Sequence, residues 1–315
     1  MAFALVFPGQ GSQSVGMLSA LANDEPGVLE TFAEASEVLG YDLWKLCQEG
    51  PEALLGTTER TQPAMLTAGV ATWRVWRKHG GPLPSAMAGH SLGEYTALVA
   101  AGALDFKTAV ALVQFRGQAM QAAVPAGQGA MAAILGAEDA AVEEACREAA
   151  QGEVVQAANF NSPGQIVIAG SAAAVDRAIE LLKAKGAKRA IKLPVSVPSH
   201  SALMAPAAER LAQRLTATHV EQPGIGDIYT VDVRKQGDAA SIKQALVQQL
   251  VKPVRWTETV QAMVAGGARA VIECGPGKVL TGLNRRIEKN KDIAMLAIED
   301  SASLQQALQA AHAAA

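Results

Sequence analysis

Cysteine is scarce in the sequence, and so are aromatic side chains and charge of either sign. Three cysteines occur among 315 residues, Cys47, Cys146 and Cys274, and no two of them form a CxxC pair. A disulfide framework or a zinc site needs several suitably spaced cysteines, so the sequence predicts neither. We expect a protein of a reducing compartment, the cytoplasm.

Long runs of one kind of residue are absent too. The net charge is -3 and no basic run occurs, which argues against nucleic acid as a partner. No segment reaches the about 18 apolar residues that a membrane span requires. Residues 3–7 are apolar, but they lack the basic region and the length of a signal peptide. We therefore expect no membrane attachment.

Small and aliphatic side chains supply most of the apolar composition. Hydrophobic residues make up 50% of the chain, and aromatic residues only 4%. Such a chain can form a sizeable core, and its small side chains let helices pack closely on a sheet. Segments typical of strands alternate with segments typical of helices, which predicts an α/β fold with a mostly parallel sheet.

The middle of the chain has a different order of elements. Between residues 127 and 194 the pattern is strand, helix, strand, strand, helix, strand, the order of a ferredoxin-like unit. The sequence therefore predicts a large α/β domain formed by residues 1–126 and 195–315. The small domain, residues 127–194, is inserted into it.

The strongest local signal is the pentapeptide Gly89-His90-Ser91-Leu92-Gly93. It lies between a strand expected at 85–88 and a helix expected at 91–101. In that context G-x-S-x-G is the nucleophile-elbow pattern, which exposes the serine hydroxyl and directs helix N–H groups toward a developing oxyanion. Ser91 is thus a candidate nucleophile. The alternative is an ordinary glycine-rich turn.

A serine nucleophile needs a base, and His200 is the best placed of the five histidines. It follows the inserted unit and opens a helix, where the chain re-enters the large domain. No acidic residue lies near it in sequence, so a backbone carbonyl could be the third member of the catalytic group. A lone histidine is also compatible with a structural role.

Two further segments allow more than one interpretation. Residues 7–13, FPGQGSQ, follow the first strand but lack the last glycine of a dinucleotide fingerprint, where Ser14 stands. They form either a tight turn or a loop that donates a backbone N–H to an oxyanion. Arg116 lies in an apolar helix and should be paired, either with an acidic side chain or with a substrate carboxylate.

Six motifs occur in order along the chain: FPGQGSQ at 7–13, GHSLGE at 89–94, Arg116-Gly117, NFNSPGQ at 159–165, VPSH at 197–200 and ECGPG at 273–277. Together they resemble the motifs of the malonyl-CoA:acyl carrier protein transacylases of bacterial fatty-acid synthesis. The resemblance covers nearly the whole chain, and the combination is specific. The resemblance implies a hydrolase-like α/β domain with an inserted ferredoxin-like (βαββαβ) domain.

The resemblance also implies roles for individual residues. Ser91 corresponds to the nucleophile and His200 to its base. Arg116 corresponds to the group that holds the malonyl carboxylate. The backbone N–H groups of Gln10 and Leu92 correspond to the oxyanion hole.

Two glutamines complete the implied site, and the reaction follows from it. The carbonyl of Gln249 would orient His200, and Gln62 would line the pocket. By the resemblance, malonyl-CoA acylates Ser91, and the phosphopantetheine thiol of acyl carrier protein then takes the malonyl group in a ping-pong reaction. Malonyl-CoA and acyl carrier protein are the expected partners, and neither a metal nor a redox cofactor is expected.

The sequence departs from the family pattern at one place, and two other protein classes are alternatives. Tyr229-Thr230 stands where an asparagine is expected before Val231-Asp232, which bears on the edge of the pocket. A serine esterase or thioesterase would share the elbow but transfer the acyl group to water. A non-catalytic carrier-binding protein would keep these loops without forming an acyl-serine.

Overall fold

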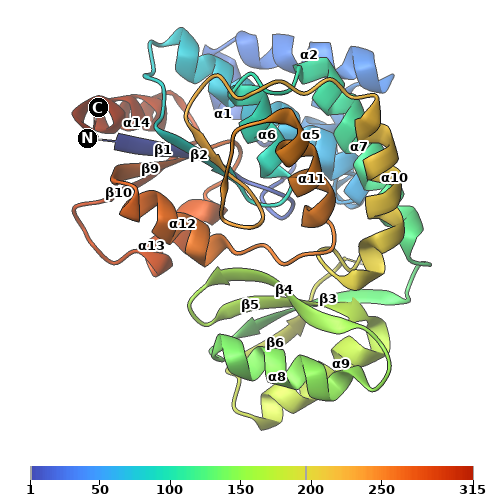
Figure 1. Cartoon of the computed structure of the whole chain (residues 1–315). Coiled ribbons are helices and arrows are strands. Elements are labelled where there is room, and N and C mark those ends of the chain that lie inside the picture. Colours follow the sequence, from blue (N-terminus) through green and yellow to red (C-terminus); the bar gives the residue numbers. More distant parts are fainter. Residues whose placement is uncertain (1, 196, 315) are drawn as a thin grey trace.

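Two β-sheets organise the chain (Figure 1). The computed structural model describes residues 2–195 and 197–314. The larger sheet has the strand order β10-β9-β1-β2-β7-β8, and its neighbours pair in parallel except β7 and β8. Its strands are β1 (Ala2–Phe7), β2 (Ala86–Gly89), β7 (Asp227–Tyr229), β8 (Lys235–Gln236), β9 (Ala268–Cys274) and β10 (Ala294–Ile298). The prediction of an α/β fold with a mostly parallel sheet is confirmed.

Helices cover both faces of the larger sheet, as the sequence of β1 requires. Phe3, Leu5 and Phe7 belong to one apolar core, whereas Ala4 and Val6 belong to another. Successive side chains of a strand point to opposite faces, so a wholly apolar strand is stable only when both faces are buried.

Most of the helices contribute to the first of these cores. They are α1 (Ser19–Asp24), α2 (Gly27–Leu39), α3 (Leu43–Glu49), α4 (Glu52–Leu55), α5 (Thr58–Lys78), α6 (Gly93–Ala100), α7 (Phe106–Ala123), α10 (Ala205–Thr216), α11 (Ala239–Gln249) and α14 (Ser301–Ala314). Helices α12 (Trp256–Ala265) and α13 (Val279–Ile287) pack in the second core. Within the described ranges, no helix combines the length and the apolar character needed to cross a bilayer.

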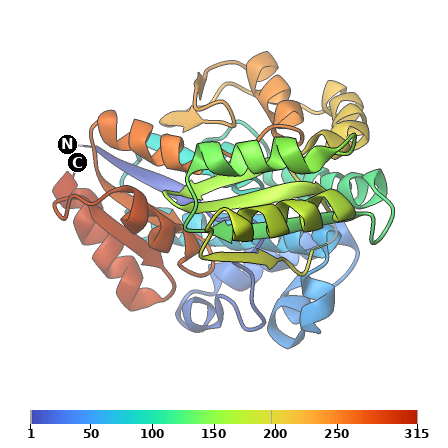
Figure 2. The same cartoon turned by 90° about the horizontal axis from the view of Figure 1, so that it is seen from below.

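The smaller sheet is antiparallel throughout, with the strand order β4-β5-β3-β6. Its strands are β3 (Gly129–Leu135), β4 (Val155–Ser162), β5 (Gln165–Ser171) and β6 (Arg189–Lys192). Helices α8 (Asp139–Ala150) and α9 (Ala172–Ala184) cover the face that is turned away from the larger sheet (Figures 1 and 2). The other face of the smaller sheet is therefore directed toward the larger part of the molecule.

Strand β4 joins the smaller sheet to the rest of the chain. The N–H of Phe160 donates to the carbonyl of Val254 at 2.9 Å, and the N–H of Val254 donates to the carbonyl of Ala158, also at 2.9 Å. The link between α11 and α12 thus pairs with β4 in the way a short strand would.

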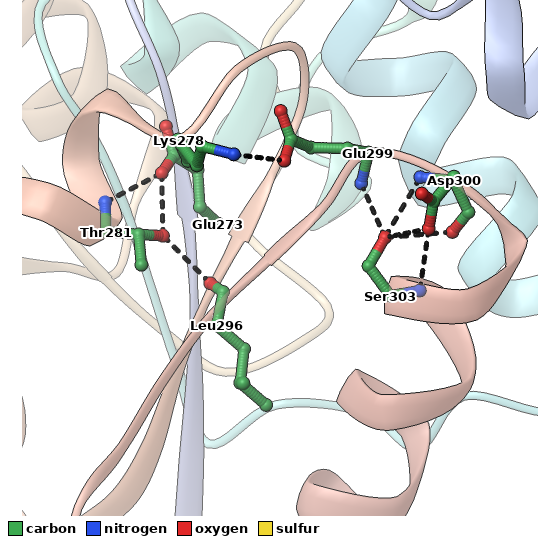
Figure 3. Close-up of polar contacts among 7 residues, drawn as sticks. All are labelled: Glu273, Lys278, Thr281, Leu296, Glu299, Asp300 and Ser303. Atoms are coloured by element: carbon green, nitrogen blue, oxygen red, sulfur yellow. Dashed lines mark hydrogen bonds and ion pairs between the residues drawn. The ribbon is translucent and has the colours of Figure 1, made fainter.

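A buried carboxylate fixes the start of α13 (Figure 3). Glu273, near the end of β9, accepts hydrogen bonds from the N–H groups of Leu280 (3.1 Å) and Thr281 (2.7 Å) and from the Thr281 hydroxyl (2.8 Å). The first N–H groups of a helix lack intrahelical partners, so a carboxylate placed there satisfies them. The ECGPG motif, which contains Glu273, therefore anchors a helix in this chain.

The apolar pattern of residues 228–233 predicts a strand, but the strand that forms there is shorter. β7 ends at Tyr229, and the chain turns back into β8. The carboxylate of Asp232 accepts a hydrogen bond from the N–H of Arg234 at 3.3 Å, which favours a turn, and Val233 has a positive φ of 60°. The apolar residues of this segment suggested a longer strand, but the local side-chain hydrogen bond decides the conformation.

The turn between β2 and α6 has no space for a side chain at Gly93. A Cβ there would lie 2.0 Å from the carbonyl oxygen of Phe7. We expect Gly93→Ala to lower the free energy of unfolding by about 3 kcal/mol, because the backbone must move apart. Gly282→Ala in α13 is the control, since nothing lies within 4 Å of the added Cβ. Urea unfolding measures the free energy of unfolding of both variants, and an equal decrease in the two would contradict this prediction.

Candidate active site

Ser91 lies in a strained turn at the carboxyl end of the larger sheet. Its φ is 52°, in a region that residues other than glycine rarely adopt. The N–H of Glu94 donates to the Ser91 carbonyl at 3.0 Å, and the N–H of His90 donates to the carbonyl of Phe7 at 3.0 Å. The side chain is half-buried and follows strand β2 directly, in the arrangement that the elbow pattern describes.

His200 is hydrogen-bonded to Ser91 and is itself held by a backbone carbonyl. Its Nε2 lies 2.8 Å from Ser91 Oγ, and its Nδ1 lies 2.7 Å from the carbonyl oxygen of Gln249. A carbonyl can only accept, so Nδ1 carries the proton and Nε2 is free to accept the proton of the serine. Burial, and then the charge of Arg116, lower the pKa of His200 to about 3. The imidazole is therefore neutral at physiological pH.

Arg116 projects from α7 toward the same hydroxyl. One of its terminal nitrogens, Nη2, lies 3.4 Å from Ser91 Oγ and donates to the side-chain oxygen of Gln249 at 2.9 Å. The guanidinium also lies over the ring of Tyr95, 5.5 Å from its centroid. The side chain is 1% exposed, yet among the described residues no carboxylate forms an ion pair with it. A buried cation with neutral partners is suited to bind an anion.

Gln249 connects these groups through both its backbone and its side chain. Its side-chain amide donates to the carbonyl of Ser91 at 3.0 Å and to the carboxyl of Glu94 at 2.7 Å. The oxygen of the same amide accepts from Arg116, and the backbone carbonyl accepts from His200. One residue thus contacts the serine, the histidine and the arginine.

Two backbone N–H groups are available beside the serine. Residues 8–11 follow β1, and a Cβ added at Gly9 would lie 2.3 Å from the carbonyl oxygen of His90, so this loop packs against the turn. In the parts of the chain that the structure describes, neither the N–H of Gln10 nor that of Leu92 has a hydrogen-bond partner. Free N–H groups are what an oxyanion hole requires. The oxyanion role remains a prediction for both.

Gln62 is not connected to these residues. It is buried in α5, and its amide lies 3.3 Å from the sulfur of Met120. Within the described residues, no hydrogen bond joins Gln62 to Ser91, His200 or Arg116. Its role as a pocket-lining residue therefore remains a prediction.

Two residues of the smaller sheet make contacts with this site that the sequence did not reveal. The amide of Gln156 on β4 accepts from the N–H of Ala202 at 3.1 Å and donates to the carbonyl of His200 at 3.4 Å. The side-chain oxygen of Asn161, also on β4, lies 2.8 Å from Nε2 of His90, the residue before Ser91. No sequence signal distinguishes Gln156 from other polar residues on a strand, and nothing in the NFNSPGQ motif indicates the contact of Asn161.

A small cavity of about 10 Å³ lies beside the network. Ser91, Glu94 and Gln249 contribute to its lining, together with Tyr229 and Thr230. The departure from the family pattern at Tyr229-Thr230 is therefore close to the serine. Glu94 belongs to the GHSLGE motif, but the sequence assigned it no role.

The comparisons with known proteins agree with this geometry. Residues 4–306 match the family model described as acyl transferase domain. The malonyl CoA-acyl carrier protein transacylase of Salmonella typhimurium is 58% identical over 285 residues, which cover 90% of this chain and 92% of that protein. The protein of the same name from Bacillus subtilis is 45% identical over 307 residues, 97% of this chain and 96% of its own.

Solved structures resemble the whole chain. A malonyl CoA-acyl carrier protein transacylase from Coxiella burnetii superposes with a TM-score of 0.96 at 50% identity and covers 99% of this chain and 98% of its own. A malonyl-transacylase in complex with a type II PKS acyl-carrier protein gives a TM-score of 0.95 at 55% identity, covering 98% and 99%.

The reactivity of Ser91 should be insensitive to mild acid. A neutral fluorophosphonate should label Ser91 at nearly the same rate at pH 7 and at pH 5, because a histidine with a pKa of about 3 stays unprotonated over this range. A base with the ordinary pKa of about 6.5 would lose most of its neutral form between pH 7 and pH 5, and the labelling rate would fall roughly 20- to 30-fold. Mass spectrometry measures the labelling, with Ser91→Ala as the unlabelled control. A rate that falls with a midpoint near 6.5 would contradict this assignment.

Proposed function

The chain belongs to the acyl transferase family and is an acyltransferase, and from this premise we propose that it transfers malonyl groups from malonyl-CoA to acyl carrier protein. The observation that carries the proposal is the position of the Ser91 hydroxyl, 2.8 Å from His200 Nε2 and 3.4 Å from Arg116 Nη2. A nucleophile with a base on one side and a buried cation on the other suits an acyl group that carries a carboxylate.

The structure also supports a more specific assignment of the two domains. We infer a hydrolase-like large domain from the strand–turn–helix that carries Ser91 on a mostly parallel sheet. We infer a ferredoxin-like small domain, residues 127–194, from the order β4-β5-β3-β6 with two helices on one face. The large domain then comprises residues 1–126 and 195–315.

The first half of the proposed reaction acylates Ser91. His200 Nε2 takes the hydroxyl proton while Ser91 Oγ attacks the thioester carbonyl carbon of malonyl-CoA. The N–H groups of Leu92 and Gln10 donate to the oxygen that becomes negative. When this intermediate collapses, the carbon–sulfur bond breaks, and the CoA thiolate leaves with the proton from His200.

The second half repeats these steps in reverse. His200 takes the proton of the phosphopantetheine thiol, and the sulfur attacks the malonyl-serine carbonyl. Collapse breaks the bond to Ser91 Oγ, which recovers the proton. The carbonyl of Gln249 keeps the imidazole oriented in both halves. The reaction supplies malonyl units for fatty-acid elongation in the cytoplasm and uses no metal or redox cofactor.

Arg116 selects the acyl group in this proposal. Malonyl differs from acetyl by one carboxylate, which a planar guanidinium can hold with two parallel hydrogen bonds. Holding that carboxylate beside Ser91 also orients the thioester for attack. Gln62, which is buried in α5, would contribute to the lining of the acyl pocket.

Incubation with malonyl-CoA should add one malonyl group to the protein, located on Ser91, because the serine is the nucleophile that attacks the thioester. Intact-mass measurement should show the adduct in the native chain and none in Ser91→Ala. Carrier protein that bears phosphopantetheine should remove the adduct, whereas carrier protein without that group should not. An adduct on the alanine variant would rule out Ser91 as the nucleophile, and rapid loss of the adduct to water would indicate an esterase or thioesterase.

Replacing Arg116 by alanine should separate malonyl from acetyl transfer. Without the guanidinium, kcat/KM for malonyl-CoA should fall by about 100-fold or more, the size expected for a bidentate charged hydrogen bond. Acetyl transfer does not use this contact and should stay the same or rise. Arg210→Ala is the control. Arg210 is exposed and lies on α10, and its guanidinium lies over the ring of Phe115, the neighbour of Arg116 on α7. If malonyl and acetyl transfer fall together, Arg116 does not hold the carboxylate.

A further inference from the structure

Glu94 is a buried acid that the proposed reaction does not use. It lies in the first turn of α6, three residues after Ser91, and is 2% exposed. One carboxyl oxygen, Oε2, accepts from the Gln249 amide at 2.7 Å, while Oε1 has no partner among the described residues. The small cavity beside the network, with space for about one water molecule, touches this side chain.

The contacts of the Gln249 amide are satisfied in one orientation only. Its nitrogen faces two acceptors, the carboxyl of Glu94 and the carbonyl of Ser91, and its oxygen faces a donor, Arg116. If the amide turned over, its oxygen would face two acceptors and its nitrogen would face a guanidinium. Glu94 supplies the shorter of the two contacts to the nitrogen, so it contributes strongly to fixing the orientation.

The charge state of Glu94 is compatible with this arrangement. Burial raises its pKa to about 8, although the hydrogen bond from Gln249 and the charge of Arg116 lower it. At pH 7 the carboxyl is therefore mostly neutral, and its carbonyl oxygen still accepts from Gln249. A neutral Glu94 leaves the positive charge of Arg116 uncompensated and available to an anionic substrate.

We propose that Glu94 is a positioning residue that acts through the side chain of Gln249 to hold Arg116 in place for the carboxylate of the acyl group. This inference rests on the proposed function. Without the carboxyl, the amide of Gln249 can rotate, and Arg116 loses the acceptor that aims it at Ser91. The backbone carbonyl of Gln249 is unaffected by that rotation, so His200 keeps its orientation. The loss should therefore affect malonyl transfer much more than acetyl transfer.

Glu94→Met and Glu94→Gln form a matched pair for the test, because both keep the volume and only glutamine keeps a strong acceptor. We expect Glu94→Met to lower kcat/KM for malonyl-CoA by about 10- to 100-fold and to change acetyl transfer by less than about threefold. Glu94→Gln should recover most of the malonyl activity. Glu94→Ala replaces the methionine variant if that variant does not unfold cooperatively.

Coupling to Gln249 tests the route of the effect. The Gln249→Met variant retains the backbone carbonyl. In that background, adding Glu94→Met should lower kcat/KM for malonyl-CoA by less than about twofold. Three results would overturn the proposal: the same loss in both backgrounds, equal losses of malonyl and acetyl transfer, or no recovery in Glu94→Gln. Each variant is compared with the native chain, whose malonyl transfer is measured first, so failure of the proposed function is recognised separately.

Discussion

The hydrogen bonds of Gln249 connect Ser91, His200 and Arg116, and the arrangement of the rest of the site depends on them. Gln249 is the last residue of α11, where backbone carbonyls have no intrahelical partner and carry the negative end of the helix dipole. Its carbonyl can therefore orient His200 in the way a carboxylate does in a serine–histidine–aspartate triad. A neutral carbonyl adds no full negative charge, which suits a site that must admit an anionic acyl group.

The smaller sheet also makes hydrogen bonds to the site. Through Gln156 and Asn161, strand β4 contacts the loop of His200 and the turn that contains Ser91. Both His200 and Ser91 have positive φ values, 59° and 52°, which cost free energy unless surrounding contacts enforce them. The smaller sheet supplies such contacts, so the geometry of the site and the packing of the two sheets depend on each other.

The sequence predicted those features that local patterns determine. The turn around Ser91 follows from a few adjacent residues. Likewise, an aspartate directly before a helical segment predicts an N-cap, and Asp105 caps α7 by accepting from the N–H of Thr108. The contacts of Glu94 and Gln156 could not be predicted, because their partners lie far away in the chain. The predicted length of β7 was wrong for a local reason. The hydrogen bond that Asp232 accepts favours a turn, and the pattern of apolar residues does not contain that information. Family resemblance supplied Gln249, whose position no spacing rule would have indicated.

The charges around His200 link binding of the acyl group to its transfer. Burial and the charge of Arg116 lower the pKa of this histidine, and a weakly basic imidazole accepts the serine proton poorly. A carboxylate bound to Arg116 offsets that positive charge and so removes one cause of the low pKa. In the proposed reaction, His200 is therefore a stronger base when a malonyl group is bound than when an acetyl group is bound. In the proposed reaction Arg116 thus favours malonyl twice, once by binding its carboxylate and once through the basicity of His200.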